Sequence, residues 1–373
     1  MSKTEKITVL CLFGGNSTEY EVSCRSFNSV AGNIDEKKFN IIKVGIAKDG
    51  AWNIYTGSNE NIKNLSWIND SENLFPCALI PKNKTNKKSC LYKFANKYIN
   101  ENGESFERIN IDVILPIIHG ANGEDGTIQG LAQLYEIPCA GADTSGSVCS
   151  YDKVIMKILC AKIDGINMAD YIAFKKYEFD KNPENILKLA EEKLKFPMFV
   201  KPANAGSSVG IFKVKEKDGQ TGLKRAVHDA FKYDDKVLIE ENITGKEIEV
   251  AVVGNNDNLI ASCPGEIVPN AEFYDYDTKY INDTAEYYIP ATIDEETSEK
   301  VREFAKKVYM TVGAGGFSRV DFFVDKDNKI YFNETNSIPG FTDISMFAKL
   351  MMYHEKITYK EVVTKIIELA LEK

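Results

Sequence analysis

Apolar residues follow two different spacings along the first third of the chain. Mainly apolar runs, which are typical of buried strands, occupy residues 7–13, 41–46 and 112–118. Between the first two runs, apolar residues recur at the spacing of one helix face: Phe27, Val30, Ala31 and Ile34. Strands that alternate with helices predict a parallel sheet, so we expect an α/β domain over residues 1–142.

A central domain is expected over residues 143–236. It contains two strand-like runs, at 198–201 and 211–214, joined by a loop of small residues. This pattern predicts a hairpin that carries a flexible loop at its tip.

The last domain is expected over residues 237–373. Its strands are accompanied by two amphipathic helices, around 301–312 and 359–371. Residues 56–108 are rich in Asn and Lys and carry no motif, so we interpret them as surface elaboration of the first sheet.

Composition and charge narrow the classes of function. With 43% apolar and 27% charged residues the chain is typical of globular proteins, and no stretch approaches the roughly 18 apolar residues of a membrane span. The net charge of -9 disfavours nucleic-acid and anionic-membrane partners, which require a basic surface. Eight cysteines without a CxxC pair fit a reducing cytoplasm, and with only three histidines we expect no zinc site.

A charged constellation lies on two expected strands near the end of the chain. Residues two apart on a strand share a face, so Arg319 is expected beside Asp321, and Glu334 beside Asn336. Carboxylate and amide oxygens suit Mg²⁺ that bridges nucleotide phosphates, and a guanidinium stabilises developing negative charge. The alternative is a surface strand pair with a salt bridge. The apolar neighbours of these residues favour the site, because buried charges need partners.

Phosphate binding requires cations and close backbone approach. Lys153, Lys201 and the glycine- and serine-containing loop 206–210 supply both, although such a loop is by itself also typical of a plain hairpin turn. Neither a P-loop nor a GxGxxG motif follows the first strand, so any nucleotide is expected to bind in another way.

Two loops follow expected strands at the edge where open α/β sheets bind ligands. The loop at 14–23 contains Glu19 and Glu21, which could hold an ammonium group or could only favour the start of a helix through capping and the helix dipole. His119 opens the second loop and could orient a substrate or be merely a loop residue.

Together these pieces resemble the D-alanine:D-alanine ligase family of the ATP-grasp superfamily, which includes D-alanine:D-serine ligase variants. The order and spacing of the motifs carry the resemblance, which runs from Gly14 to about Phe347. The matching segments are 14–23 (GGNSTEYEVS), 119–130 (HGANGEDGTIQG), 152–153 (DK), 200–210 (VKPANAGSSVG), 240–247 (EENITGKE), 273–280 (FYDYDTKY), 319–321 (RVD), 333–336 (NETN) and 339–342 (PGFT). The resemblance implies a three-domain α/β ATP-grasp fold with ATP held between the last two domains.

The resemblance also implies roles for individual residues. ATP would be bound by Lys153, Lys201, Ser208, Glu240 and Glu247, with Glu240 at the adenine and Glu247 at the ribose. Two Mg²⁺ ions, replaceable by Mn²⁺, would be held by Asp321, Glu334 and Asn336. The first D-amino acid would meet Glu21 and His119, with Ser207 and Tyr280 linking Glu21 to the lid, and the second would meet Lys279 and Ser345. Arg319 and the backbone N–H of Gly340 resemble an oxyanion-stabilising pair.

The implied reaction joins two D-alanines through an acyl phosphate, for peptidoglycan precursors, in a cytoplasmic homodimer. Segments 206–210 and 273–280 would close over ATP as lids. The chain departs from the family at Tyr151, where Met is usual, and at Asp343, which adds a carboxylate near Ser345. Residues 141–149 resemble the branch that accepts D-serine, whereas Met346 resembles the D-alanine branch. Another ATP-grasp ligase and a catalytically lapsed binding protein are the remaining alternatives.

Overall fold

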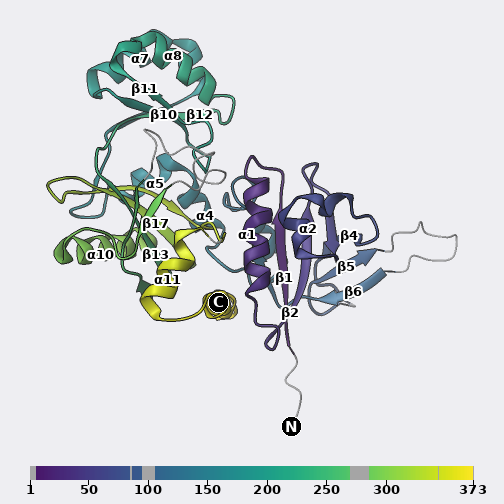
Figure 1. The fold of residues 1–373 in the computed structure, drawn as a ribbon. Coiled ribbons are helices and arrows are strands. Elements are labelled where there is room, and N and C mark those ends of the chain that lie inside the picture. The colour runs from purple at the N-terminus through teal and green to yellow at the C-terminus, as the bar shows by residue number, and fades with distance from the viewer. Residues whose placement is uncertain (1–5, 85, 95–105, 269–284, 343, 373) are drawn as a thin grey trace.

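The computed structural model describes residues 6–84, 86–94, 106–268, 285–342 and 344–372. The chain forms three sheets, and Figure 1 shows the N-terminal unit beside the other two. Lys279, Tyr280 and Asp343, together with the expected lid 273–280, lie outside the described residues.

The first unit is built on a seven-stranded sheet with the order β6-β5-β4-β3-β2-β1-β7. Its elements are β1 (Ile7–Gly14), α1 (Tyr20–Gly32), β2 (Phe39–Ile46), β3 (Trp52–Tyr55), α2 (Asn59–Lys63), η1 (Ser66–Asn69), β4 (Leu74–Ile80), β5 (Cys90–Phe94), β6 (Phe106–Asn110), β7 (Val113–Pro116) and α3 (Thr127–Leu134). Strand β1 pairs in parallel with β2 and β7, as its apolar run predicts. From β2 to β6 the pairing is antiparallel, so the segment without motifs extends the sheet.

The second unit is a four-stranded antiparallel sheet with the order β11-β10-β12-β9, covered by helices at the top of Figure 1. Its elements are β9 (Tyr171–Lys175), α6 (Lys176–Lys181), α7 (Pro183–Lys193), β10 (Met198–Pro202), β11 (Phe212–Val214), η2 (Glu216–Asp218), α8 (Gly219–Ala230) and β12 (Lys236–Glu241). Strands β10 and β11 pair antiparallel and form the expected hairpin. Because β12 pairs with β10 and β9, the expected domain boundary after residue 236 falls inside this strand.

The third unit is a second seven-stranded sheet with the order β16-β15-β13-β17-β18-β8, to which β14 adds through β13. Its elements are α4 (Thr144–Tyr151), α5 (Lys153–Cys160), β8 (Asn167–Met168), β13 (Lys246–Asn255), β14 (Asn258–Ala261), β15 (Gly265–Val268), β16 (Glu286–Tyr288), α10 (Glu295–Thr311), β17 (Gly316–Val324), β18 (Ile330–Asn336), α11 (Met346–Glu355) and α12 (Tyr359–Leu371). Met156 and Cys160 of α5 share a buried cluster with Val301 and Val308 of α10, so α5 packs on this sheet.

One continuous apolar core joins the first and third units. Phe27 of α1 and Leu115 of β7 belong to the same buried cluster as Phe317 of β17, Phe347 of α11 and Ile366 of α12. Figure 1 shows α12 end-on between the two units. The loops at the carboxyl ends of β1 and β7 are therefore held next to the strands that carry Arg319 and Asn336.

The eight cysteines are all free thiols, so no disulfide constrains the fold. Among the described residues, no helix has the length and apolar content needed to cross a membrane.

Candidate active site

A cavity of about 370 Å³ lies between the four-stranded sheet and the third sheet. Its lining includes all five residues expected to bind ATP, two of the three expected to bind metal, and two expected to be catalytic: Lys153, Lys201, Ser208, Glu240, Glu247; Asp321, Glu334; Ser207 and Arg319. Residues from α5, β10, β12, β13, β17 and β18 meet here, although they are separated by up to about half of the chain. The structure thus confirms that these motifs share one cavity.

Arg319 and Asp321 lie on one face of β17, as strand alternation predicts. The Nε and Nη2 atoms of Arg319 donate to the two carboxylate oxygens of Asp321 at 2.8 and 2.7 Å. A second carboxylate, Glu249 of β13, lies 3.2 Å from Arg319 Nε and is buried. Two buried carboxylates around one guanidinium fix its plane, which limits the directions from which Arg319 can meet a substrate.

The same strand pair brings together the donors expected for a metal. Asp321 lies opposite Glu334 across β17 and β18, with a register shift directly after Asp321. Asn336 Nδ2 donates to Asp321 Oδ2 at 2.9 Å, and Lys153 Nζ lies 3.5 Å from Glu334 Oε2. Two facing carboxylates and an amide in a cavity that also holds lysines fit Mg²⁺ bound together with phosphates, since hard cations prefer oxygen ligands.

Lys153 is held at the first turn of α5. The Asp152 carboxylate caps this helix by accepting from Val154 N–H and Ile155 N–H, both at 3.0 Å, and it forms an ion pair with Lys236 of β12. Lys153 Nζ donates to Ala205 O at 2.6 Å. The lysine therefore links α5 to the small-residue loop and, through Glu334, to the candidate metal ligands.

Glu240 lies between two lysines at the back of the cavity. It forms an ion pair with Lys201 of β10, and its Oε2 is 3.0 Å from Nζ of Lys157, which is only 3% exposed. Burial alone would raise the pKa of this carboxyl, but the two ammonium groups outweigh burial and lower the pKa to about 2. Glu240 is therefore a fixed anionic acceptor, as recognition of an amino group requires.

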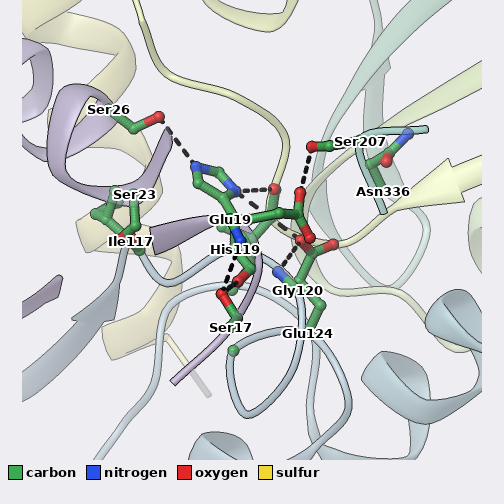
Figure 2. A network of polar contacts seen from close by, with 12 residues as sticks. Ser17, Glu19, Ser23, Ser26, Ile117, His119, Gly120, Glu124, Ser207 and Asn336 are labelled. Atoms are coloured by element: carbon green, nitrogen blue, oxygen red, sulfur yellow. Dashed lines mark hydrogen bonds and ion pairs between the residues drawn. The ribbon is translucent and has the colours of Figure 1, made fainter. Parts of the chain in front are cut away.

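The first-helix carboxylate that meets the small-residue loop is Glu19, which corrects our prediction of Glu21. Ser207 Oγ donates to Glu19 Oε1, whereas Glu21 has a side chain 45% exposed and lies 3.9 Å from Arg25. The reason is helical geometry: α1 begins at Tyr20, and residues two apart near a helix point to nearly opposite sides. Figure 2 shows Glu19 pointing toward Ser207.

Glycines on both sides of Glu19 leave room for its carboxylate. A Cβ on Gly120 would lie 2.3 Å from Glu19 Oε2, and a Cβ on Gly206 would lie 2.8 Å from the same atom. The loops after β7 and β10 therefore approach this carboxylate as closely as their backbones allow.

His119 and Glu124 are buried beside Glu19 (Figure 2). Glu124 Oε1 accepts from Gly120 N–H at 2.9 Å, and burial next to the Glu19 carboxylate raises the pKa of Glu124. Burial lowers the pKa of His119 to about 4, so its imidazole is neutral at pH 7. His119 thus lies near Glu19, whereas its expected place was beside Glu21; its contact with a substrate stays a prediction.

Gly340 and Ser345 lie together after β18. A Cβ on Gly340 would be 2.6 Å from Ser345 Oγ, which accepts from Thr342 N–H at 3.1 Å and pairs with Thr342 Oγ1 at 2.8 Å. Ser345 thus stabilises the turn before α11. Its expected contact with a second amino acid stays a prediction.

Three residues of the site, Lys157, Glu249 and Glu124, were not assigned a role from the sequence, whereas Glu19 was a candidate for the ammonium beside Glu21. Lys157 follows Lys153 by four residues on one helix, and Glu249 follows Glu247 by two on one strand, so local periodicity contained a signal for both. Within the described ranges no three His, Cys, Asp or Glu side chains gather as a metal cluster, and the candidate Mg²⁺ ligands depend on an asparagine.

Known proteins resemble this chain over nearly its whole length. The family descriptions "D-ala D-ala ligase N-terminus" and "D-ala D-ala ligase C-terminus" match residues 8–142 and 160–368. The curated D-alanine–D-alanine ligase of Caldicellulosiruptor bescii is 43% identical over 99% of this chain and 96% of its own, and D-alanine–D-alanine ligase B of Clostridium tetani is 42% identical over 98% and 94%.

Solved structures agree with the sequence comparison. The VanG D-Ala:D-Ser ligase from Enterococcus faecalis superposes with a TM-score of 0.83 at 37% identity, covering 98% of this chain and 100% of that one. The D-alanine-D-alanine ligase from Coxiella burnetii superposes with a TM-score of 0.80 at 28% identity, covering 99% and 95%.

The fold and the cavity define an ATP-grasp ligase, as the motifs predict. The chain belongs to the D-alanine–D-alanine ligase family, whose members use ATP and a divalent metal ion.

Proposed function

We propose that this protein is an ATP-dependent ligase that joins two D-alanines into D-alanyl-D-alanine, a peptidoglycan precursor. The observation that carries the proposal is the convergence, in one cavity, of Lys153, Lys201 and Arg319 with the facing pair Asp321 and Glu334. Such a cavity can neutralise a triphosphate and stabilise an anionic transition state at the same place.

ATP binds with its adenine at Glu240 and its ribose at Glu247. The ionised Glu240 accepts a hydrogen bond from an exocyclic amino group, and Lys157 and Lys201 keep it ionised. Lys153, Lys201 and Ser208 face the phosphates. Ser207 and Ser208 both have positive φ, 52° and 60°, which bends loop 206–210 so that it can cover them.

Asp321, Glu334 and Asn336 hold two Mg²⁺ ions, for which Mn²⁺ can substitute. When bound, the metal neutralises phosphate charge and orients the γ-phosphoryl group. Arg319 pairs with Asp321 and Lys153 with Glu334, so both cations lie beside the carboxylates that would hold the metal.

The first D-alanine places its ammonium at Glu19, whose carboxylate is held by Ser207. One oxygen of its carboxylate attacks the γ-phosphorus of ATP, the bond from that phosphorus to the β–γ bridging oxygen breaks, and an acyl phosphate and ADP form. Lys153 and Lys201 compensate the charge that develops on the phosphates.

The second D-alanine attacks the acyl carbon with its unprotonated amine. A tetrahedral oxyanion forms beside Arg319 and the backbone N–H of Gly340; it collapses as inorganic phosphate leaves, and the nitrogen loses its extra proton. An acyl phosphate hydrolyses readily, so closure of loop 206–210 protects it from water.

D-Serine as second substrate is the competing function. It is favoured by the superposition on a D-Ala:D-Ser ligase and by the resemblance of residues 141–149 to that branch. We further propose a homodimer in the cytoplasm, where ATP and free thiols are both found.

The test is phosphate release from Mg-ATP by the purified protein, with products identified by mass. D-Alanine alone is expected to give ADP, phosphate and a dipeptide. Addition of D-serine, D-lactate or L-alanine tests the acceptor, and mixed product that appears only with D-serine would replace the D-alanine proposal. If no D-amino acid causes phosphate release while Mg-ATP still binds, the protein would instead be a binding protein that has lost catalytic activity.

A further inference from the structure

The imidazole of His119 is buried and uses both ring nitrogens. Nδ1 lies 3.1 Å from the carbonyl oxygen of Ile338, and Nε2 lies 3.0 Å from Ser26 Oγ (Figure 2). A carbonyl oxygen can only accept, so the hydrogen of a neutral ring must be on Nδ1. Nε2 then has a lone pair directed at Ser26.

Ser26 of α1 also contacts the chain on the other side of Gly340. Its Oγ accepts from Phe341 N–H at 3.3 Å, which leaves its own hydrogen for His119 Nε2. The bonds therefore run in one direction, from Phe341 N–H to Ser26, from Ser26 O–H to His119 Nε2, and from His119 Nδ1–H to Ile338 O. We call this set of contacts the His119 hydrogen-bond chain.

Only the neutral imidazole gives every donor in the His119 hydrogen-bond chain an acceptor. In an imidazolium, Nε2 would carry a hydrogen toward a Ser26 hydroxyl that already accepts from Phe341, and the serine hydrogen would lose its acceptor. The ionisable groups beside the imidazole include the Glu124 carboxyl, which lies 3.9 Å from Nδ1 and has a raised pKa, and the Arg319 guanidinium, whose charge further lowers the pKa of His119.

The His119 hydrogen-bond chain ends at Ile338 O and at Phe341 N–H, and Gly340 lies between these two residues in the sequence. On its other side, Gly340 packs against Ser345, whose Oγ would lie 2.6 Å from a Cβ at position 340. The short loop that carries Gly340 N–H is thus fixed from α1, from the loop after β7 and from the start of α11.

We propose that Ser26 is a positioning residue, which directs the hydrogen bonds of neutral His119 and thereby orients the Gly340 N–H toward the reacting carbonyl. The consequence for catalysis rests on the proposed function, whereas the tautomer and the loop anchoring do not. Ser26 belongs to the N-terminal unit and Gly340 to the third, so the contact also makes the oxyanion site depend on how the two units dock.

The first test reads the tautomer directly. The chain has only three histidines, so ¹⁵N-histidine labelling gives a spectrum of three imidazoles, in which His119→Gln identifies one. We expect the neutral Nδ1–H form for His119 at pH 7. Ser26→Ala is expected to shift the Nε2 resonance of His119. Ser29 is a second buried serine of α1 and is not part of the His119 hydrogen-bond chain, so Ser29→Ala is expected to leave this resonance unchanged. An Nε2–H tautomer or an imidazolium in the unaltered protein would overturn the proposal.

The second test separates positioning from folding. Ser26→Ala is expected to lower kcat for dipeptide formation roughly fivefold to tenfold, the effect of one hydrogen bond, and to leave the Kd for ATP unchanged. Ser26→Thr, which keeps the hydroxyl, is expected to recover kcat, and Ser29→Ala to match the unaltered protein. If Ser26→Ala fails to fold, Ser26→Cys replaces it. A shifted Nε2 resonance with normal kcat would show that the His119 hydrogen-bond chain does not position Gly340. Absence of any ligase activity in the unaltered protein would refute the proposed function and leave the tautomer result standing.

Discussion

The hydroxyl of Ser207 donates a hydrogen bond to the carboxylate of Glu19 across 188 positions of sequence. This contact joins the loop expected to cover the phosphates to the start of the first helix. In the proposed function this hydrogen bond would link recognition of the first amino acid to closure over ATP.

Glu19→Gln is expected to lower kcat/KM for D-alanine about 10- to 100-fold, because a hydrogen bond to a charged group contributes about 1.5–3 kcal/mol. Steady-state kinetics with varied D-alanine measure this. Glu21→Gln is the matched control, since that side chain is exposed beside Arg25, and it is expected to change kcat/KM less than twofold. The reverse ranking of the two variants would restore Glu21 as the ammonium ligand.

Arg319→Ala is expected to abolish turnover while ATP binding is largely kept, because the guanidinium acts on the oxyanion and not on the nucleotide. Loss of one oxyanion donor typically costs roughly 10²- to 10³-fold in kcat. Since Arg319 also balances Asp321 and Glu249, Arg319→Lys is the companion variant that keeps the charge. Arg225→Ala, at an exposed arginine of α8, is the control. If ATP affinity falls and kcat at saturation stays normal, the oxyanion role is wrong.

Lys157→Met is expected to raise the KM for ATP at least tenfold and to leave the KM for D-alanine unchanged. Glu240 would keep only Lys201 as a counter-ion, so its pKa would rise and its position would loosen. Titration with ATP and GTP measures the effect, since a fixed hydrogen-bond acceptor favours a 6-amino group over a 6-oxo group. Lys162→Met, an exposed lysine just beyond α5, is the control. An unchanged ratio of ATP to GTP affinity would show that Lys157 has no part in base recognition.

The free energy of unfolding is expected to fall between pH 6.5 and pH 4 because of His119. The folded protein keeps this imidazole neutral to about pH 4, whereas the unfolded chain binds a proton near pH 6.5. The unfolded state therefore binds more protons in this window, and its relative stability rises as the pH falls. Between pH 7 and pH 5 this one group is expected to cost about 2 kcal/mol.

Denaturant unfolding at pH 5 and pH 7 measures this effect. His119→Gln removes the titrating group, so the variant is expected to lose less stability than the unaltered protein over the same interval. Equal losses in both proteins would mean that His119 does not remain neutral in the folded state.

Part of this site follows from local pattern alone. Alternation along a strand places Arg319 beside Asp321, and their bidentate contact agrees with it. Apolar runs locate β1, β2, β10 and β17, and the order of motifs identifies the family. Strand alternation and helix periodicity depend only on residues two to four positions apart, so the sequence specifies them wherever the element lies in the fold.

Tertiary structure decided which side chains meet. Near a helix start, residues 19 and 21 differ by about half a turn, and only the docking of α1 against the loops after β7 and β10 selects Glu19. The pairing of Lys157 with Glu240 and of Ser26 with Phe341 joins residues 83 and 315 positions apart. Such contacts depend on how whole sheets and helices pack, because burial of their apolar faces sets the docking and the polar side chains then follow.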